Sequence, residues 1–226
     1  MALVTSPENY AKGLLPLLRL LIGSDIPARL GDIWQLGRKV FAARAHEGMY
    51  EVLEYESVLE LQDTKGKKAV LRKRERVKFT QNNIIAFQDL ALGDGELFAE
   101  YQCSPGKSVD RYRDGHRYRI LISLQETKRR GDVQEFRIER TIANGFTDKV
   151  EYFQTEVDHR TKELLVRIIF PQRRFPKQVV LVEQNLQRTT PLGPEHLFLL
   201  PDGRQQLSWC TMKPRVFETY ILKWEW

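Results

Sequence analysis

The stretch YEVLEYESVLELQDTKGKKAVLRKRERVKF, residues 50–79, decides the fold. Its first half alternates Leu53, Tyr55, Leu59 and Leu61 with glutamates, which is the two-residue period of a half-buried strand. Its second half continues the period with Ala69, Leu71, Val77 and Phe79 among basic residues. A short polar loop that contains Gly66 joins the two halves, so the stretch predicts a β-hairpin.

The basic residues of the second predicted strand fall on one face: Arg72, Arg74, Arg76 and Lys78. Alone, such a ladder would indicate a surface that follows phosphates. A hairpin closed around Thr64–Gly66 brings Glu56 opposite or near Arg74, and Glu54 opposite or near Arg76. Opposite charges facing each other across antiparallel strands contribute about 0.2–1 kcal/mol each. We therefore interpret the ladder as mostly self-neutralised.

Beyond the hairpin, the chain continues with short β-rich runs between turn dipeptides such as Asp114-Gly115 and Asp202-Gly203. The runs richest in Ile, Val, Phe and Tyr are Arg117–Leu124, Glu135–Ile142, Val150–Val157, Leu164–Phe170, Val179–Glu183 and Tyr220–Trp226. This spacing predicts about nine or ten strands, as in sandwiches or strongly curved sheets.

Two helices are predicted before Gly48. Thr5–Glu8 carries the hydroxyl cap, proline and glutamate of a helix start, and Ser24–Pro27 begins a second helix that runs toward Ala45. The fold class is therefore α+β, mainly β, with two N-terminal helices packed on antiparallel β-structure. We divide the chain into a helical segment 1–48, an antiparallel β unit 49–130 and a sandwich-like unit 131–226. The same pattern also fits one continuous domain.

The C-terminal strand alternates Tyr220, Leu222, Trp224 and Trp226 with mostly polar residues. Together with Gly203-Arg204, Leu207 and Trp209, it resembles the last two strands of an immunoglobulin-like sandwich, over about the final sixty residues. The chain is also similar to modules attached to bacterial multi-protein signalling and defence systems. That resemblance implies an accessory subunit.

Composition bounds the class of protein. The 226 residues are 42% hydrophobic and 29% charged, enough for a real core, and the net charge is +6. Two distant cysteines, Cys103 and Cys210, form no disulfide framework or metal spacing. The longest apolar run, Leu14–Ile22, is shorter than the roughly 20 residues of a membrane span. The first ten residues lack the features of a secretory signal, so we expect a cytoplasmic protein.

No motif assigns a reaction. The four histidines are never at ligand spacing, and no nucleophile signature or phosphate-binding loop is present. We therefore assign no catalytic residue, no metal and no cofactor. An enzyme with a site assembled from distant carboxylates, such as Asp89, Asp94 and Asp114, stays an alternative hypothesis.

Two binding hypotheses follow. The leading one is a non-enzymatic adapter that recognises a protein partner, with oligomeric state open, through exposed strand edges and an apolar segment containing Leu14, Leu17, Leu18 and Leu21. The alternative is a nucleic-acid-binding component with a basic sheet surface, because arginines interleaved with tyrosines can hold phosphates and stacked bases. Its residues are Arg111, Arg113, Arg117, Arg119, Lys128, Arg129 and Arg130.

Overall fold

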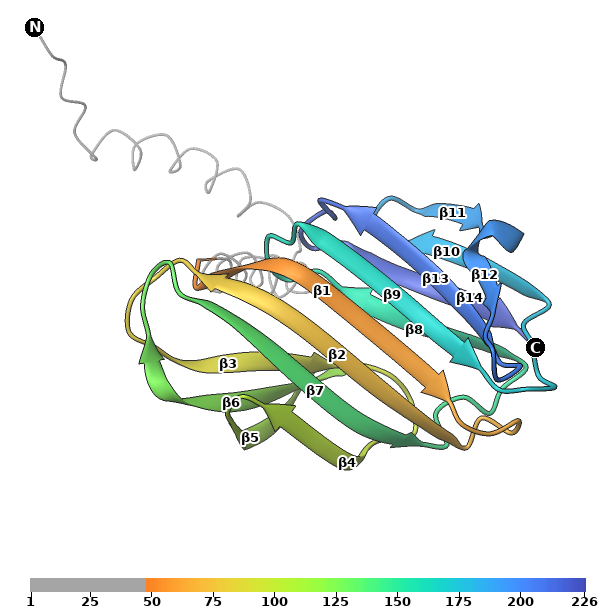
Figure 1. Ribbon diagram of the computed structural model, residues 1–226, viewed down its shortest axis with the longest axis horizontal. Helices are drawn as coiled ribbons and strands as arrows, with labels where there is room; N and C mark the ends of the chain where they lie inside the picture. Colours follow the sequence, from red (N-terminus) through yellow and green to blue (C-terminus); the bar gives the residue numbers. More distant parts are fainter. Residues whose placement is uncertain (1–47) are drawn as a thin grey trace, which may run out of the picture. The chain divides into compact units, whose positions relative to one another are not determined.

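The computed structural model describes residues 48–226, and these residues form three β-sheets joined by turns (Figure 1). In chain order the strands are β1 (Tyr50–Leu61), β2 (Lys68–Phe79), β3 (Ile84–Ala91), β4 (Glu96–Ser104), β5 (Lys107–Asp114), β6 (Arg117–Lys128), β7 (Val133–Ala143), β8 (Val150–Glu156), β9 (Glu163–Phe170), β10 (Gln178–Glu183), β11 (Arg188–Pro191), β12 (Leu197–Leu199), β13 (Gln205–Met212) and β14 (Thr219–Glu225). A short 3₁₀ helix, η2 (Pro194–His196), precedes β12.

The three sheets differ in size. The largest has seven strands in the order β12-β13-β9-β1-β2-β7-β4. A four-stranded sheet has the order β11-β10-β14-β8, and a three-stranded sheet has the order β3-β6-β5. The prediction of a mainly β protein is therefore confirmed for the part of the chain that the structure describes.

The predicted hairpin is present as β1 and β2. Its register places Glu56 opposite Arg74 and Glu54 opposite Arg76, as predicted. The turn is held by Asp63, whose carboxylate accepts hydrogen bonds from the backbone N–H groups of Lys65 (2.7 Å) and Lys68 (2.7 Å). An aspartate that binds nearby backbone donors in this way is typical of a tight turn.

The arginines of the basic ladder on β2 are neutralised, so the ladder is mostly self-neutralised, as predicted. Arg74 contacts Glu54 at 3.0 Å and Glu56 at 3.1 Å on β1, and Glu135 at 3.3 Å on β7. Arg72 lies between Glu60 of β1 and Glu139 of β7 in the same way, at 2.6 and 2.7 Å. We call this set of ion pairs on the outer face of β1, β2 and β7 the charge lattice.

The opposite, inner face of the seven-stranded sheet carries two hydrophobic cores, one under each smaller sheet. In the first core, Leu59, Leu71 and Ile168 pack with residues of the four-stranded sheet, such as Leu222 and Trp224. The second core joins the sheet to the three-stranded sheet, and its centre is a stacked pair of rings, Phe87 and Phe136, 4.0 Å apart. The smaller sheets thus cover one face of the large one (Figure 1).

Two details of the predicted architecture are corrected. First, β1 pairs with β9 in parallel, with Tyr55 opposite Leu164, whereas antiparallel structure was predicted throughout. The connection from β1 to β9 runs through the other two sheets, which supplies the long crossover that a parallel pair needs. Second, the sandwich is not confined to the C-terminal half, because β9, β12 and β13 share their sheet with β1, β2 and β4.

More strands are present than the pattern predicted. The missed strands include β5, whose eight residues are all exposed, and β11, whose four residues are all exposed. Strands that are solvated on both faces show no alternation of apolar and polar residues, so the period-two signal is absent there. The predicted boundary near residue 130 falls between β6 and β7, and the division into domains stays a prediction.

The two predicted helices lie in residues 1–47, outside the described residues. Within residues 48–226, no helix is long and apolar enough to cross a membrane.

Candidate functional site

Four charged side chains lie inside the protein, between the two hydrophobic cores. Lys73 and Glu75 come from β2, Asp89 from β3 and Arg140 from β7, and all four are buried. Lys73 and Glu75 occupy the two inward positions of β2 between Leu71 and Val77. They point inward because successive side chains of a strand alternate between its faces, and the odd-numbered residues of β2 face the core. With Tyr101 of β4 we call these residues the polar seam.

The centre of the polar seam is an ion pair between Lys73 Nζ and Asp89 Oδ1. Lys73 also donates to the backbone carbonyl of Leu90 at 3.1 Å, and Tyr101 donates its hydroxyl to Asp89 Oδ2 at 3.1 Å. Burial by itself lowers the pKa of Lys73, but Asp89, Tyr55 and Glu75 outweigh it, so the pKa of Lys73 is raised above its ordinary value. Lys73 is therefore charged, and both Asp89 oxygens have partners.

Glu75 is the titratable member of the seam. Its Oε1 lies 3.7 Å from Lys73 Nζ. Burial raises the pKa of Glu75 to about 7, Asp89 and Asp158 also raise it, and Lys73 opposes them. Carboxylates with such pKa values occur at functional sites because burial and like charges are combined there.

Arg140 is the incompletely paired member. Its Nε and Nη1 are buried and find no hydrogen-bond partner among residues 48–226. The guanidinium carbon lies 5.8 Å from the ring centre of Phe98, and burial lowers the pKa of Arg140. A buried polar network with unpaired donors costs free energy of folding. The polar seam is therefore not an energetically neutral part of the core.

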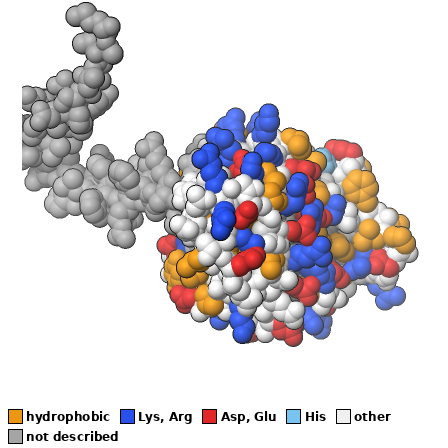
Figure 2. All heavy atoms as spheres, turned by 60° about the vertical axis from the view of Figure 1, so that its left-hand side comes forward, with side chains coloured by type: hydrophobic (Ala, Val, Ile, Leu, Met, Phe, Trp, Pro, Cys, Tyr) orange, Lys and Arg blue, Asp and Glu red, His pale blue; other side chains and the backbone are white. Residues whose placement is uncertain are grey.

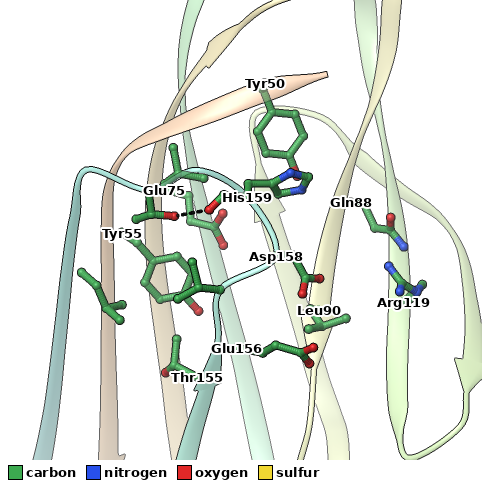
Figure 3. A pocket seen from close by; sticks show the side chains of 14 residues that line it. Tyr50, Tyr55, Glu75, Gln88, Leu90, Arg119, Thr155, Glu156, Asp158 and His159 are labelled. Atoms are coloured by element: carbon green, nitrogen blue, oxygen red, sulfur yellow. Dashed lines mark hydrogen bonds between the residues drawn. The ribbon is translucent and has the colours of Figure 1, made fainter. Parts of the chain in front are cut away.

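A pocket opens beside the seam, between the edge strand β3 and the segment that follows β8. We call it the acidic pocket. It is lined by Tyr50, Tyr55, Glu75, Leu90, Glu156, Asp158 and His159, with Gln88 and Arg119 across from them (Figure 3). About 50 Å³ of it is open to the centre of a water molecule. Since one water needs about 10–15 Å³ by this measure, the pocket has room for a group of a few heavy atoms.

The rim of the acidic pocket is held by ion pairs and rings. Arg117 of β6 contacts Glu156 at 2.7 Å and Asp158 at 3.9 Å. The rings of Tyr50 and His159 lie 4.2 Å apart, and Figure 3 shows them together at one end of the pocket. His159, which the sequence places in a loop, thus belongs to the wall of a pocket.

The predicted nucleic-acid residues on β5 and β6 are divided between two faces of their sheet. Arg111 lies opposite Ile120 and Arg113 opposite Tyr118, on the face turned toward β4, where Arg111 stacks on Phe98 at 4.4 Å. Residues directly opposite each other in a sheet share a face. By the same pairing, Arg117 and Arg119 lie on the other face, where Arg119 contacts Asp114 at 2.7 Å.

The remaining basic residues of that set lie at the turn between β6 and β7. Lys128 forms an ion pair with Glu126 and donates a hydrogen bond to Gln134 Oε1 at 3.0 Å. Arg129 and Arg130 are exposed. Basic and acidic side chains are intermixed on the face seen in Figure 2. Nucleic-acid binding by these residues stays a prediction.

The three carboxylates of the enzyme hypothesis have separate surroundings. Asp89 belongs to the polar seam, Asp94 accepts a hydrogen bond from Tyr152 at 3.3 Å, and Asp114 contacts Arg119. Within residues 48–226, no group of three His, Cys, Asp or Glu side chains is arranged to hold a metal ion. The predicted partner-binding residues Leu14, Leu17, Leu18 and Leu21 lie outside the described residues.

No family model and no curated protein matches this chain. Among solved structures, it is similar to an M1 zinc metallopeptidase from Deinococcus radiodurans, with 12% identity and a TM-score of 0.43. A mutant of that enzyme bound to a Tyr-Ser-Ala substrate gives 13% identity and a TM-score of 0.44. Each comparison covers 77% of this chain and 42% of the other, so the chain spans less than half of those structures. A likeness this distant supports no conclusion about activity.

The sequence contained a signal for the polar seam that the sequence-based prediction missed. Lys73 and Glu75 stand at inward positions of a strand whose other inward residues are apolar, and Arg140 stands between Ile138 and Ile142 on β7. Charged residues are almost never fully buried unless they are paired. A charge at an inward position of a strand therefore indicates a buried partner elsewhere in the chain.

Proposed function

We propose that this chain is a non-catalytic binding subunit that recognises a protein partner through its three-stranded sheet. The observation that carries the proposal is the exposure of this sheet. All eight residues of β5 are exposed, and β5 is the last strand of its sheet, with β6 as its paired neighbour. The backbone groups on its outer edge are therefore available to pair with an added strand.

Exposed apolar side chains accompany this edge. Val109 and Tyr112 on β5 are 57% and 48% exposed, and Leu121 on the neighbouring strand β6 is 37% exposed. Ile85, which is 66% exposed, lies on β3 at the opposite edge of the same sheet. Aromatic and aliphatic side chains beside an unpaired edge are the contacts that an extended peptide uses when it adds to a sheet. They support a protein partner with apolar residues at alternate positions.

The charges of β5 favour a peptide over a nucleic acid. The strand carries Lys107, Arg111 and Arg113, but also Asp110 and Asp114. Phosphates placed along this strand would meet carboxylates, and the repulsion would offset the attraction of the arginines. A polypeptide of mixed charge meets no such penalty.

The experiment is co-expression with the products of neighbouring genes, followed by mapping of any complex by hydrogen exchange and by two variants. We expect β5 amides to become protected in the complex. The double variant Val109→Glu and Tyr112→Glu on β5 should weaken the complex at least tenfold. The control is Leu199→Glu on β12, an apolar residue on another sheet that is 72% exposed.

Two results would overturn the proposal. One is a complex in which β5 exchanges as fast as in the free chain and the double variant binds normally. The other is a chain that stays monomeric and captures none of the co-expressed proteins. Circular dichroism of each variant confirms that it is folded.

A further inference from the structure

Three connections between strands meet at one end of the sheets. They join β8 to β9, β10 to β11 and β13 to β14, and with the last residue of β13 they comprise residues 157–162, 184–187 and 212–218. Backbone hydrogen bonds of 2.7 Å join Phe217 N–H to the Val157 carbonyl and Lys213 N–H to the Lys162 carbonyl, and the Asn185 side chain donates to the Phe217 carbonyl. Figure 1 shows the end of β13 beside the start of β9, in line with their antiparallel pairing. We call these three segments the loop tip.

The loop tip exposes large apolar side chains. Met212 is 68% exposed, Phe217 is 44% exposed and Leu186 is 37% exposed. Phe217 also has a φ of +67°, a left-handed conformation that is strained for a bulky residue. Its N–H bond to Val157 and the bond from Val157 N–H to the Glu218 carbonyl (3.0 Å) hold this conformation. The fold therefore retains a strained backbone at a ring that stays in contact with solvent.

Basic side chains surround these apolar residues. Four of them are exposed: Arg160, Lys162, Lys213 and Arg215. Lys162 lies 3.8 Å from Glu51, and it is the one of the four that forms an ion pair among residues 48–226. The positive charge of the other three is therefore open to a partner.

The acidic residues of the loop tip are less exposed than the basic ones. Glu218 is 2% exposed, and its Oε1 accepts hydrogen bonds from the backbone N–H groups of Asn185 (2.8 Å) and Thr219 (3.1 Å). Asp158 and Glu163 are half-buried, and Asp158 lies 3.9 Å from Arg117. The surface that the loop tip presents to solvent is consequently apolar and basic.

This combination matches an anionic lipid surface. Apolar side chains enter the boundary between headgroups and acyl chains, and basic side chains are attracted to anionic headgroups. A bilayer accepts apolar side chains at any lateral spacing, whereas a protein partner needs pockets that match three side chains on separate segments. The net charge of +6 favours the same encounter.

We propose that the loop tip docks the protein on an anionic lipid bilayer. Phe217, Met212 and Leu186 enter the headgroup region, and Lys213 and Arg215 contact the negative charges of the lipids. This surface is separate from the partner surface on β5, and the two proposals stand independently.

The test is sedimentation of the full chain with lipid vesicles. One set contains phosphatidylcholine with about one-third phosphatidylserine, and the other contains phosphatidylcholine alone. We expect at least tenfold stronger partitioning to the anionic vesicles, and a decrease in added NaCl because salt screens the basic side chains. Equal partitioning to both sets, or none to either, would overturn the proposal.

Charge variants locate the contact. Lys213→Ala with Arg215→Ala should lower the partition coefficient about thirtyfold, since each basic residue near an anionic surface contributes about fivefold. The matched control is Arg129→Ala with Arg130→Ala, which removes the same charge from exposed residues of the β6–β7 turn and should bind normally. Equal losses in both double variants would show that net charge alone attracts the protein, and would contradict the loop tip.

The apolar contribution is tested at Phe217. Asparagine tolerates the left-handed conformation, so Phe217→Asn should keep the thermal stability of the fold while partitioning falls about tenfold. Leu199→Asn, on the exposed strand β12, should bind vesicles normally. Full binding by Phe217→Asn and by the Lys213 and Arg215 double variant would place the lipid contact elsewhere in the chain and overturn the proposal. Binding to soluble polyglutamate without binding to anionic vesicles would also overturn it, in favour of an acidic protein partner.

Discussion

Arg74 on β2 lies directly opposite Glu56 on β1, and its Nε donates to Glu56 Oε2 at 3.1 Å. The same guanidinium reaches Glu54 at 3.0 Å and Glu135 at 3.3 Å, so one arginine ties three strands together. The side chains of Arg74 and Glu56 are 36% and 21% exposed, which means that water screens the pair only in part. The charge lattice therefore aligns strands without supplying a basic surface.

Removing this pair should have a modest effect on stability. In a double-mutant cycle of Glu56→Gln and Arg74→Gln, we expect a coupling free energy of about 0.5–1 kcal/mol, because partly exposed ion pairs contribute no more than this. The measurement is urea unfolding. The coupling should shrink in 1 M NaCl, and a salt-independent coupling above about 2 kcal/mol would contradict the screened lattice.

The buried pair of the polar seam should behave differently. Asp89→Ala leaves the buried Lys73 ammonium with only Glu75, 3.7 Å away, as an acidic neighbour, so we expect a loss of about 3–5 kcal/mol in the free energy of unfolding. The double variant Lys73→Met with Asp89→Leu should recover most of this loss, since it removes both charges. Equal losses in the single and double variants would show that the loss in the free energy of unfolding comes from altered packing and not from the uncompensated charge.

Stability should depend on pH through Glu75. Its folded-state pKa of about 7 lies above the ordinary value of 4.5, so the folded protein binds a proton more tightly than the unfolded chain. The stabilisation is therefore complete below about pH 4.5 and is lost as the pH rises through 7. Other carboxylates titrate as well, so the measured quantity is the difference between the native chain and Glu75→Gln.

The difference in the free energy of unfolding between the native chain and Glu75→Gln should decline between pH 4.5 and 7 and level off above pH 8. A difference that rises with pH would mean that Lys73 dominates the titration of Glu75 and lowers its pKa.

Two glycines in turns allow a matched test of how the turn of the first hairpin packs against Phe146. Gly66 lies in that turn, and Gly115 lies in the turn between β5 and β6. Gly66 and Gly115 both have positive φ, +69° and +65°. A Cβ on Gly66 would lie 1.6 Å from the carbonyl oxygen of Phe146, whereas a Cβ on Gly115 meets nothing within 4 Å. Gly115→Ala should cost about 1 kcal/mol for the backbone conformation alone.

Gly66→Ala adds a backbone clash to the same conformational cost, so it should lower the melting temperature several times more than Gly115→Ala. Thermal unfolding of both variants measures the difference. Equal losses would show that the turn at Gly66 moves away from Phe146 at little cost.

Much of the local structure could be predicted because it rests on short-range chemistry. The alternation in residues 50–79 predicted both strands, and the polar turn around Gly66 set their register, so the Glu56 and Arg74 pair was correctly anticipated. The short exposed strand β5 could not be predicted in this way, because no face of it is buried. Its position depends on pairing with β6.

The sequence by itself determined the strands that bury one face, which side of β2 carries the arginines, and how the first hairpin closes. These features depend on the period of the backbone and on neighbours within about thirty residues. Only the tertiary structure decided that Lys73, Glu75, Asp89 and Arg140 share one buried seam and that Tyr50 and His159 wall one pocket. The two-residue period of a strand predicts that a residue points inward. The partner it meets there depends on sheets stacking and on strands β1 and β9 pairing across about a hundred residues of chain, which no local pattern encodes.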